Sequence, residues 1–501
     1  MGKASEGKNG KGNREIVVAT VTEPDSVDVH KTSSISDPTA AAYLSFLNMD
    51  DQGSTIPGAI KDYEVSDDGK EIIFSLEEGL TFHSGEPFNA DALKSSMDRF
   101  LETSPFYDNA GEITDIEVMD DYTIKFTWAE PYAPFFSNAV SPYLAPLDTS
   151  VLDGNGEGFE KNPSALGPLK ITDIKRGDSI TYEPFEDYKW PDGKPNFDKV
   201  KFRFVPDEET RALEFKKGTV NILMNVPGQY VGELEKDPEV NIEKVPDYVL
   251  NYLGWNNKLP KFQDERVRKA IALAIDRAPI VDTALEGFAR PVYGPLPEAT
   301  FGYSEEIEEK AKEIYARDTE KAKSLLEEAG WTINSKGLAE KDGEEFSVEL
   351  WVDTDPVNHR IAQILQNQLM EIGIKMNIST QESAAIIEQT PQGKHEMILW
   401  AYGWLDADVM YFLLFGEGRS TRLHYEDPEL NRILKEARVE MDVDKRLALY
   451  KEAQEFVMKE TPFVPLYVKE TIHATRGLDS FKAHPIRNYI EWEHVKASEN
   501  N

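Results

Sequence analysis

The second half of the chain alternates between runs typical of strands and runs typical of amphipathic helices. Val267, Ile271 and Ala274 recur at the spacing of one helical face, and similar stripes follow. Alternation of this kind packs helices on a sheet, so we predict an α/β fold. The helices are expected at about 264–276, 320–329, 361–372, 428–437 and 444–459, and the strands at 346–352, 374–379, 396–400 and 463–468. Thr319 is the expected cap of the helix at 320–329, and Asp427-Pro428 is expected to open the helix at 428–437, because Pro is favoured at the first helical position.

The first half is mixed, with strands before and after its helices. Asp68-Gly69 separates two β-rich segments within 63–76 and predicts a hairpin, and Asp120-Asp121 does the same within 117–126. Asn89 is a good N-cap for a helix over 90–100. Further strands are expected at 16–20, 180–184, 200–205 and 240–245, with a helix at 208–217.

Length and charge limit the partners of this protein. A chain of 501 residues is expected to form two or three packed units. Its 91 acidic and 55 basic residues give a net charge of -36, which repels nucleic acid and anionic lipid. We interpret the negative net charge as a feature that keeps the protein soluble. The alternative interpretation is that it attracts cationic ligands.

The residues needed for disulfides, metal sites, nucleotide binding and nucleophilic catalysis are absent from the sequence or scattered along it. The chain has no Cys, which excludes disulfides, thiolate nucleophiles and Cys-based zinc sites. The eight histidines form no His-x-x-x-His pair, and there is no phosphate-binding loop, dinucleotide fingerprint or Gly-x-Ser-x-Gly turn. We therefore expect no catalytic residues, no protein-built metal site and no cofactor.

The N-terminal segment 1–14 is rich in Gly and Lys and poor in apolar residues. Such a composition predicts a flexible tether. The tether of a mature lipoprotein and a plain flexible tail are both compatible with it. No apolar run approaches the ~18 residues of a membrane helix.

Ordered landmarks along the chain resemble one family. The stretch 67–91 (DDGKEIIFSLEEGLTFHSGEPFNAD) resembles the signature region of the family 5 solute-binding proteins, the extracytoplasmic receptors of ABC importers for peptides, nickel chelates and related solutes. The resemblance runs from about residue 16 to 492, and no single motif carries it. Further landmarks are GPL at 167–169, YKWPDGKP at 188–195, FQDERVRKAI at 262–271, the Ala322–Trp331 segment and DPELN at 427–431.

The resemblance implies a two-lobed periplasmic-binding-protein-like fold with a hinge. Lobe I would comprise residues 15–253 and 475–497, with an extra subdomain at about 41–164, and lobe II residues 254–474. The chain would cross between lobes near 252–255 and 472–477. The receptor would be an extracytoplasmic monomer, anchored by lipid or periplasmic, that delivers its ligand to an ABC permease.

The segment 399–408 is the strongest candidate for a ligand contact. A strand leads here into aromatic, glycine and acidic residues, which suit the wall of an enclosed solute site. The alternative is that Trp400 and Trp404 belong to the core. The candidate ligand-binding residues are Trp400, Tyr402, Gly403, Trp404, Asp406 and Asp408.

The same segment departs from the family pattern. In relatives, an aspartate three residues before an Asp-Pro pair binds the amino group of a peptide. Here Asp406-Ala407 occupies the Asp-Pro place, so Gly403 stands where that aspartate would be. A buried ammonium needs a carboxylate partner. Either Asp406 or Asp408 substitutes for it, or the ligand lacks that amine.

Residues elsewhere complete the candidate site. Arg360 falls where dipeptide-binding relatives hold a ligand carboxylate, and Arg422, with Arg419, is a similar candidate; each alternatively forms a surface ion pair. Glu23 and His30 follow the first strand, where lobe I would face the cleft, or are ordinary loop residues. The segment 128–132 is a candidate aromatic lip or a strand end.

Three functions remain for comparison. A non-enzymatic receptor would bind a peptide or, alternatively, a metal chelate, an opine or a sugar. A hydrolase would use paired carboxylates such as Asp406 and Asp408. A structural surface protein would enclose no cavity.

Overall fold

The computed structural model describes residues 14–154, 156–415 and 422–498. Most of the expected tether, and Arg419, lie outside these residues. The expected α/β class is confirmed, because helices and strands alternate through the second half of the chain and mix in the first.

One large mixed sheet runs through the molecule. Its central strands are unusually long: β12 (Val240–Trp255) has 16 residues and β20 (Phe463–Arg476) has 14, and the two pair antiparallel. On one side follow β19 (Met397–Gly403), β17 (Ser347–Val352) and β18 (Lys375–Thr380). On the other side lie β11 (Ile222–Leu223), β1 (Glu15–Thr20), β10 (Lys199–Phe204), β9 (Ser179–Pro184) and β8 (Leu169–Lys175), and β13 (Ala289–Pro291) pairs with β20.

The expected helices of lobe II cover its part of this sheet. The apolar faces of α7 (Glu265–Ala274), α9 (Thr319–Glu328) and α10 (Pro356–Met370) share one core with β17. Val348, Leu350 and Val352 of β17 lie in this core, whereas Glu349, between them on the strand, is exposed. The expected cap of α9 was wrong by one residue, because the Asp318 side chain, rather than Thr319, accepts the first-turn hydrogen bond from the Lys321 amide.

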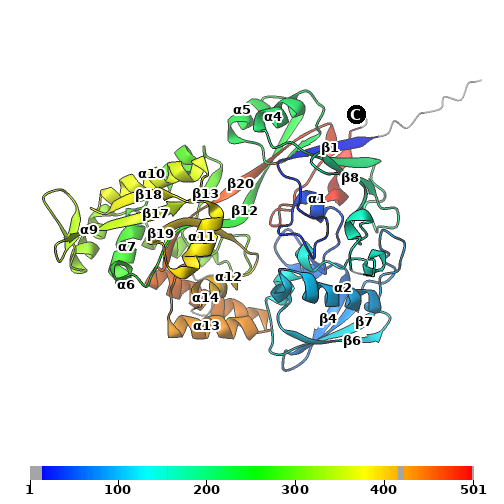
Figure 1. The fold of residues 1–501 in the computed structure, drawn as a ribbon, viewed down its shortest axis with the longest axis horizontal. Helices are drawn as coiled ribbons and strands as arrows, with labels where there is room; N and C mark the ends of the chain where they lie inside the picture. Colours follow the sequence, from blue (N-terminus) through cyan, green and yellow to red (C-terminus); the bar gives the residue numbers. More distant parts are fainter. Residues whose placement is uncertain (1–13, 155, 416–421, 499–501) are drawn as a thin grey trace, which may run out of the picture.

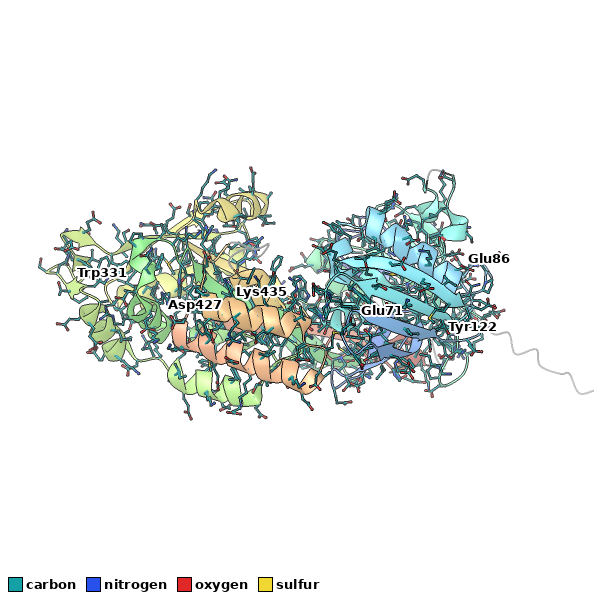
Figure 2. The ribbon with its side chains drawn as sticks, turned by 90° about the horizontal axis from the view of Figure 1, so that it is seen from below. Glu71, Glu86, Tyr122, Trp331, Asp427 and Lys435 are labelled. Carbon is teal, nitrogen blue, oxygen red and sulfur yellow. The ribbon has the colours of Figure 1, made fainter. Side chains whose placement is uncertain are left out.

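A second core of lobe II surrounds α12 (Val409–Leu414), α13 (Pro428–Val439) and α14 (Val443–Glu460). Asp427 caps α13 and Pro428 is its first residue, as the sequence predicted. Figure 2 shows α13 running from Asp427 past Lys435 toward the separate sheet that carries Glu71.

That separate sheet has four antiparallel strands and lies within the expected extra subdomain. Both predicted hairpins are confirmed: β4 (Ile60–Val65) pairs with β5 (Glu71–Leu76), and β6 (Ile113–Asp120) with β7 (Thr123–Trp128). The helix α2 (Ala90–Thr103), capped by Asn89, packs on it around an aromatic core of its own. This subdomain therefore has its own hydrophobic core.

The remaining elements are short or peripheral. They are α1 (Asp37–Ala40), α3 (Phe135–Asn138), α4 (Glu208–Lys216), α5 (Gly228–Leu234), α6 (Pro260–Gln263), α8 (Glu305–Ile314), α11 (Ser383–Gln389), β2 (Leu47–Met49), β3 (Thr55–Pro57), β14 (Thr332–Ile333), β15 (Ala339–Lys341), β16 (Glu344–Glu345), β21 (Leu478–Ser480) and β22 (Lys496–Ala497).

Figure 1 shows two bodies of structure joined by β12 and β20. The register of the β12–β20 pair shifts between Asn251 and Tyr252 and also, at a bulge, between Pro246 and Leu250. Bulges bend strands locally, and this one lies where the chain passes between the bodies. No helix of the described residues is both long and apolar enough to span a membrane.

Candidate ligand-binding cleft

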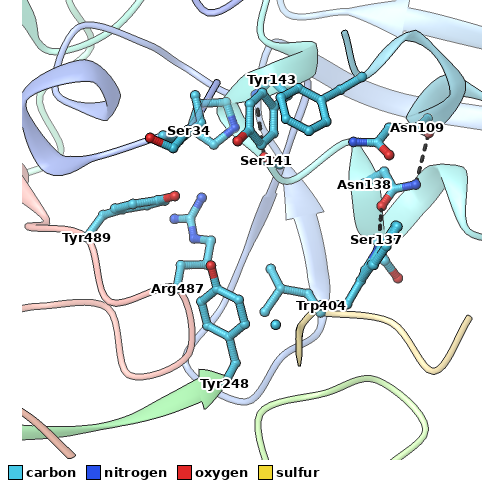
Figure 3. A pocket seen from close by; sticks show the side chains of 15 residues that line it. Ser34, Asn109, Ser137, Asn138, Ser141, Tyr143, Tyr248, Trp404, Arg487 and Tyr489 are labelled. Atoms are coloured by element: carbon cyan, nitrogen blue, oxygen red, sulfur yellow. Dashed lines mark hydrogen bonds between the residues drawn. The ribbon is translucent and has the colours of Figure 1, made fainter. Parts of the chain in front are cut away.

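A cavity of about 340 Å³ lies where the two lobes and β12 meet (Figure 3). This volume is at the lower end of the range for ligand pockets. The walls come from segments far apart in the sequence. The lining residues are Ser34, Ile35, Phe106, Asn109, Ser137, Asn138, Ser141, Pro142, Tyr143, Tyr248, Gly403, Trp404, Leu405, Arg487 and Tyr489.

Gly403 lines this cavity at the end of β19. It pairs with Val249 of β12, so the backbone of lobe II comes close to the crossing strand. A Cβ at Gly403 would lie 2.8 Å from Val249 Cγ2 and 3.1 Å from a ring carbon of Tyr248. Glycine therefore allows this close approach, and a longer side chain would displace Tyr248 from the wall.

Trp404, the next lining residue, connects the two lobes. Its indole Nε1 donates to Asn138 Oδ1 at 3.3 Å, and its ring packs against Phe412 of α12 at 5.3 Å between centroids. The opposite wall includes Tyr143, which packs on Phe106 at 4.3 Å. Aromatic faces from both lobes thus bound the same space.

Asp406 and Asp408 lie behind this wall and do not line the cavity. Asp406 is fully buried and accepts from Arg446 at 2.7 and 2.9 Å and from the Ser137 hydroxyl at 2.5 Å. Asp408 lies 3.5 Å from Arg438 Nε. Burial raises the pKa of Asp408 to about 6, an effect that the Arg438 charge opposes and the Asp406 charge reinforces. Both carboxylates are thus paired with arginines, and Asp406 also bonds across to the Ser137 loop.

Trp400, Tyr402 and Arg422 also stay outside the cavity lining. The Tyr402 hydroxyl donates to the Pro295 carbonyl, and the guanidinium of Arg422 lies 5.4 Å from the Trp400 ring centroid. Both aromatic rings pack on the α12–α14 core. In this arrangement the three residues support the strand that carries Gly403.

Glu23, His30 and Arg360 lie apart from the cavity. Glu23 accepts from the Gly177 amide at 2.8 Å and from Arg176 at 3.2 Å. His30 is buried beside Phe100, and burial lowers its pKa to about 3 because the imidazolium is desolvated. Arg360 is exposed on α10 and donates to the Ala284 carbonyl at 3.1 Å.

Most of the lobe I lining was missed from sequence. Asn109, Asn138 and Tyr143 come from three short helical turns and Arg487 and Tyr489 from one C-terminal segment, and none of these carries a local pattern of a site. Only folding brings them together. In the segment 128–132, which the sequence offered as an aromatic lip, Trp128 is core, while Tyr132 lies 5.2 Å below the Arg438 guanidinium of lobe II.

One group of potential metal ligands exists among the described residues: Asp51, His484 and Glu491. The Lys482 ammonium lies 2.8 Å from Asp51 and 2.7 Å from Glu491. His484 Nε2 bonds the Met49 carbonyl, and its Nδ1 accepts from backbone amides. The Lys482 ammonium thus already pairs with both carboxylates of this group.

A second space of about 580 Å³ also borders both lobes. Asp247 and Ile486 line it, whereas their neighbours Tyr248 and Arg487 line the first cavity. Successive strand residues point to opposite faces, so β12 separates the two spaces. The first is lined by Gly403 and Trp404, two of the ten ligand contacts predicted from sequence, and is therefore the candidate site.

The family model for bacterial extracellular solute-binding proteins, family 5, matches residues 54–421. The glutathione-binding protein GsiB of Salmonella typhi is 27% identical over 490 residues, covering 93% of this chain and 92% of that protein. The di/tripeptide-binding protein 2 of Pseudomonas aeruginosa is 26% identical over 494 residues, covering 90% and 89%.

The fold also matches solved structures. The crystal structure of NikA from Brucella suis in complex with Fe(III)-EDTA superposes with a TM-score of 0.85 at 22% identity, covering 97% of this chain and all of that one. This likeness confirms the two-lobed fold expected from the sequence. The family match covers well over half of the chain, and the chain therefore belongs to the bacterial extracellular solute-binding proteins of family 5.

Proposed function

We propose that this protein captures a short peptide, or a solute of similar size, between its two lobes and delivers it to an ABC permease. The observation that carries the proposal is the cavity walled by Trp404 and Gly403 of lobe II and by Tyr143 and Arg487 of lobe I. A site assembled from two bodies can enclose its ligand when they close.

The same proposal includes the boundaries of the two lobes that move relative to each other. Lobe I would be residues 15–253 and 475–497, with the subdomain 41–164, and lobe II residues 254–474. The hinge would be β12 and β20, with the bulge after Pro246 as the bending point. In this role the protein acts without catalysis, as an extracytoplasmic monomer that is anchored by lipid or periplasmic.

Ligand screening by thermal unfolding tests the proposal. A ligand at about a hundred times its Kd adds about 2.7 kcal/mol to the free energy of unfolding. We expect stabilisation by members of a panel of di- and tripeptides, metal chelates, opines and sugars. Absence of stabilisation by every class would contradict the receptor function, and stabilisation by non-peptides alone would replace the peptide with one of those solutes.

A further inference from the structure

We propose that Arg487 anchors a carboxylate of the ligand, and that the cavity holds no counterpart for a ligand ammonium. The inference rests on the proposed function and deepens it, because it names the chemical class that the receptor selects. The predicted ligand is a carboxylate-bearing compound whose amine, if present, contributes little to affinity.

Arg487 reaches the cavity from the segment after β21. Figure 3 shows its guanidinium pointing into the space bounded by Tyr248, Tyr489 and Tyr143. Within the described residues it makes a single hydrogen bond, from Nη1 to the Val140 carbonyl at 3.3 Å, and its buried Nε has no partner. It forms no ion pair with the described carboxylates, although the charges of Glu491 and Glu493 attract it from a longer distance.

Two other buried arginines of this fold make more hydrogen bonds through their guanidinium groups, although Arg277 also has one buried nitrogen, Nη1, without a hydrogen-bond partner. Arg446 makes two bonds to Asp406, and Arg277 donates to the carbonyls of Val292 and Pro465. A half-buried guanidinium without comparable partners is unfavourable, because it loses water without gaining hydrogen bonds. Burial lowers the pKa of Arg487, in keeping with this deficit. A bound carboxylate would supply the missing acceptors in the bidentate geometry that arginine favours.

Neighbouring groups would complete an anion site. The hydroxyls of Tyr248 and Tyr489 make no hydrogen bond to the described residues. Burial raises the pKa of both, to about 12 for Tyr248, so both stay protonated and can donate. Donors from β12 and from the C-terminal segment thus converge on the space in front of Arg487.

The charge of the lining favours a carboxylate over an amine. Of the described residues that line the cavity, Arg487 is the one that carries a charge, and none is Asp or Glu. Asp406 lies behind the wall, already paired with Arg446. An enclosed ammonium would therefore meet a cation and no anion, which is unfavourable in a desolvated site.

Matched ligands on the wild-type protein test this directly. Tripeptides with aliphatic, aromatic and polar side chains are prepared in free, N-acetylated, C-amidated and doubly blocked forms, and dicarboxylic acids are compared with their diamides. Isothermal calorimetry is expected to show that acetylation leaves Kd within about threefold, whereas amidation weakens binding by about 10–100-fold, the range of a charge-assisted hydrogen bond.

Variants then assign the effect to Arg487. Arg487→Gln should bring acid and amide forms to the same Kd, and Arg487→Lys should restore part of the difference. The matched control Arg432→Gln removes an exposed arginine paired with Glu429 and Glu436 and should leave the difference intact. Because the acid–amide comparison is first made on the wild type, poor folding of a variant does not remove the test.

The contrary outcomes are distinct. Equal binding of acids and amides, loss on acetylation, or a preference abolished by Arg360→Gln and kept by Arg487→Gln would overturn the inference and leave the receptor function standing. If no compound of any class binds, the proposed function fails, and the inference fails with it.

Discussion

At the scale of single residues, the cleft depends on a few side chains with well-defined neighbours. Gly403 fits because Tyr248 and Val249 fill the space that a Cβ would need. The sequence predicted Gly403 and Trp404 as ligand contacts, and both line the cavity. Arg487 and Tyr143 could not be predicted, because nothing in their own segments indicates that tertiary packing brings them to the same space.

Replacing Trp404 by Ala should weaken ligand binding by about 10–100-fold, since an enclosed aromatic wall contributes about 1.5–3 kcal/mol through burial. Calorimetry with the best ligand of the screen measures this. Trp331→Ala is the matched control, because Trp331 packs on Phe346 in the body of lobe II far from the cleft (Figure 2). Unchanged affinity in the Trp404 variant would remove that ring from the binding site.

Asp37 predicts a measurable pH dependence of stability. Burial raises its pKa from 3.8 to about 7, opposed by a hydrogen bond from the Ile490 amide. The folded state then holds a proton that the unfolded state releases above pH 4, so the free energy of unfolding falls as pH rises from about 4 to 7.

Asp37→Asn keeps the acceptor and removes the ionisation. We expect this variant to be more stable than the wild type by about 4 kcal/mol at pH 8 and by less than about 1 kcal/mol at pH 4. Urea unfolding at both pH values measures the difference. A variant less stable than the wild type at pH 8 would show that the ionised carboxylate is favourable in the fold.

At the scale of elements, local pattern predicted the helices and hairpins well. Asn89, Asp427 and the Asp68-Gly69 turn act as the sequence indicated, whereas the α9 cap moved from Thr319 to Asp318. The length of β12 was not predicted beyond 240–245, because its remaining partners lie more than 140 residues away in β19 and β20. Such pairings leave no local signature.

Gly167 lies where its own segment packs against the segments that carry Ala42 and His83. A substitution at Gly167 therefore tests the packing between segments that are far apart in the sequence. The Gly167 amide donates to the Ala42 carbonyl, and a Cβ there would lie 2.4 Å from the Tyr43 nitrogen. Gly167→Ala should therefore lower the free energy of unfolding by about 1–3 kcal/mol through overpacking. Gly232→Ala is the matched control: it has open space, sits in α5, and should stabilise by about 0.5–1 kcal/mol. An equal change in the free energy of unfolding in both variants would contradict the tight packing around Gly167.

At the scale of the whole molecule, two strands of one continuous sheet connect the lobes, and a few residues form hydrogen bonds from one lobe to the other. Ser137 bonds Asp406, Asn138 accepts from Trp404, and the Ala133 amide donates to the Arg438 carbonyl at 3.0 Å. These contacts all come from one short segment of the subdomain, Ala133 and the adjacent helix α3, so a small set of bonds would couple the proposed closure to the state of the cleft.

Small-angle X-ray scattering should detect that coupling. Ser137→Ala removes one inter-lobe bond without altering the hydrophobic core of either lobe, so the ligand-free variant should have a larger radius of gyration than the wild type. Saturating ligand should reduce the radius of gyration of both proteins. An identical, ligand-insensitive radius in both would argue against hinge closure.

The crystal structure of the complex with the tightest ligand of the screen tests the central claim most directly. We predict ligand density in the cavity beside Trp404, with contacts to Tyr143 of lobe I as well as to lobe II. A ligand bound on one lobe alone, or outside the space between the lobes, would contradict the account.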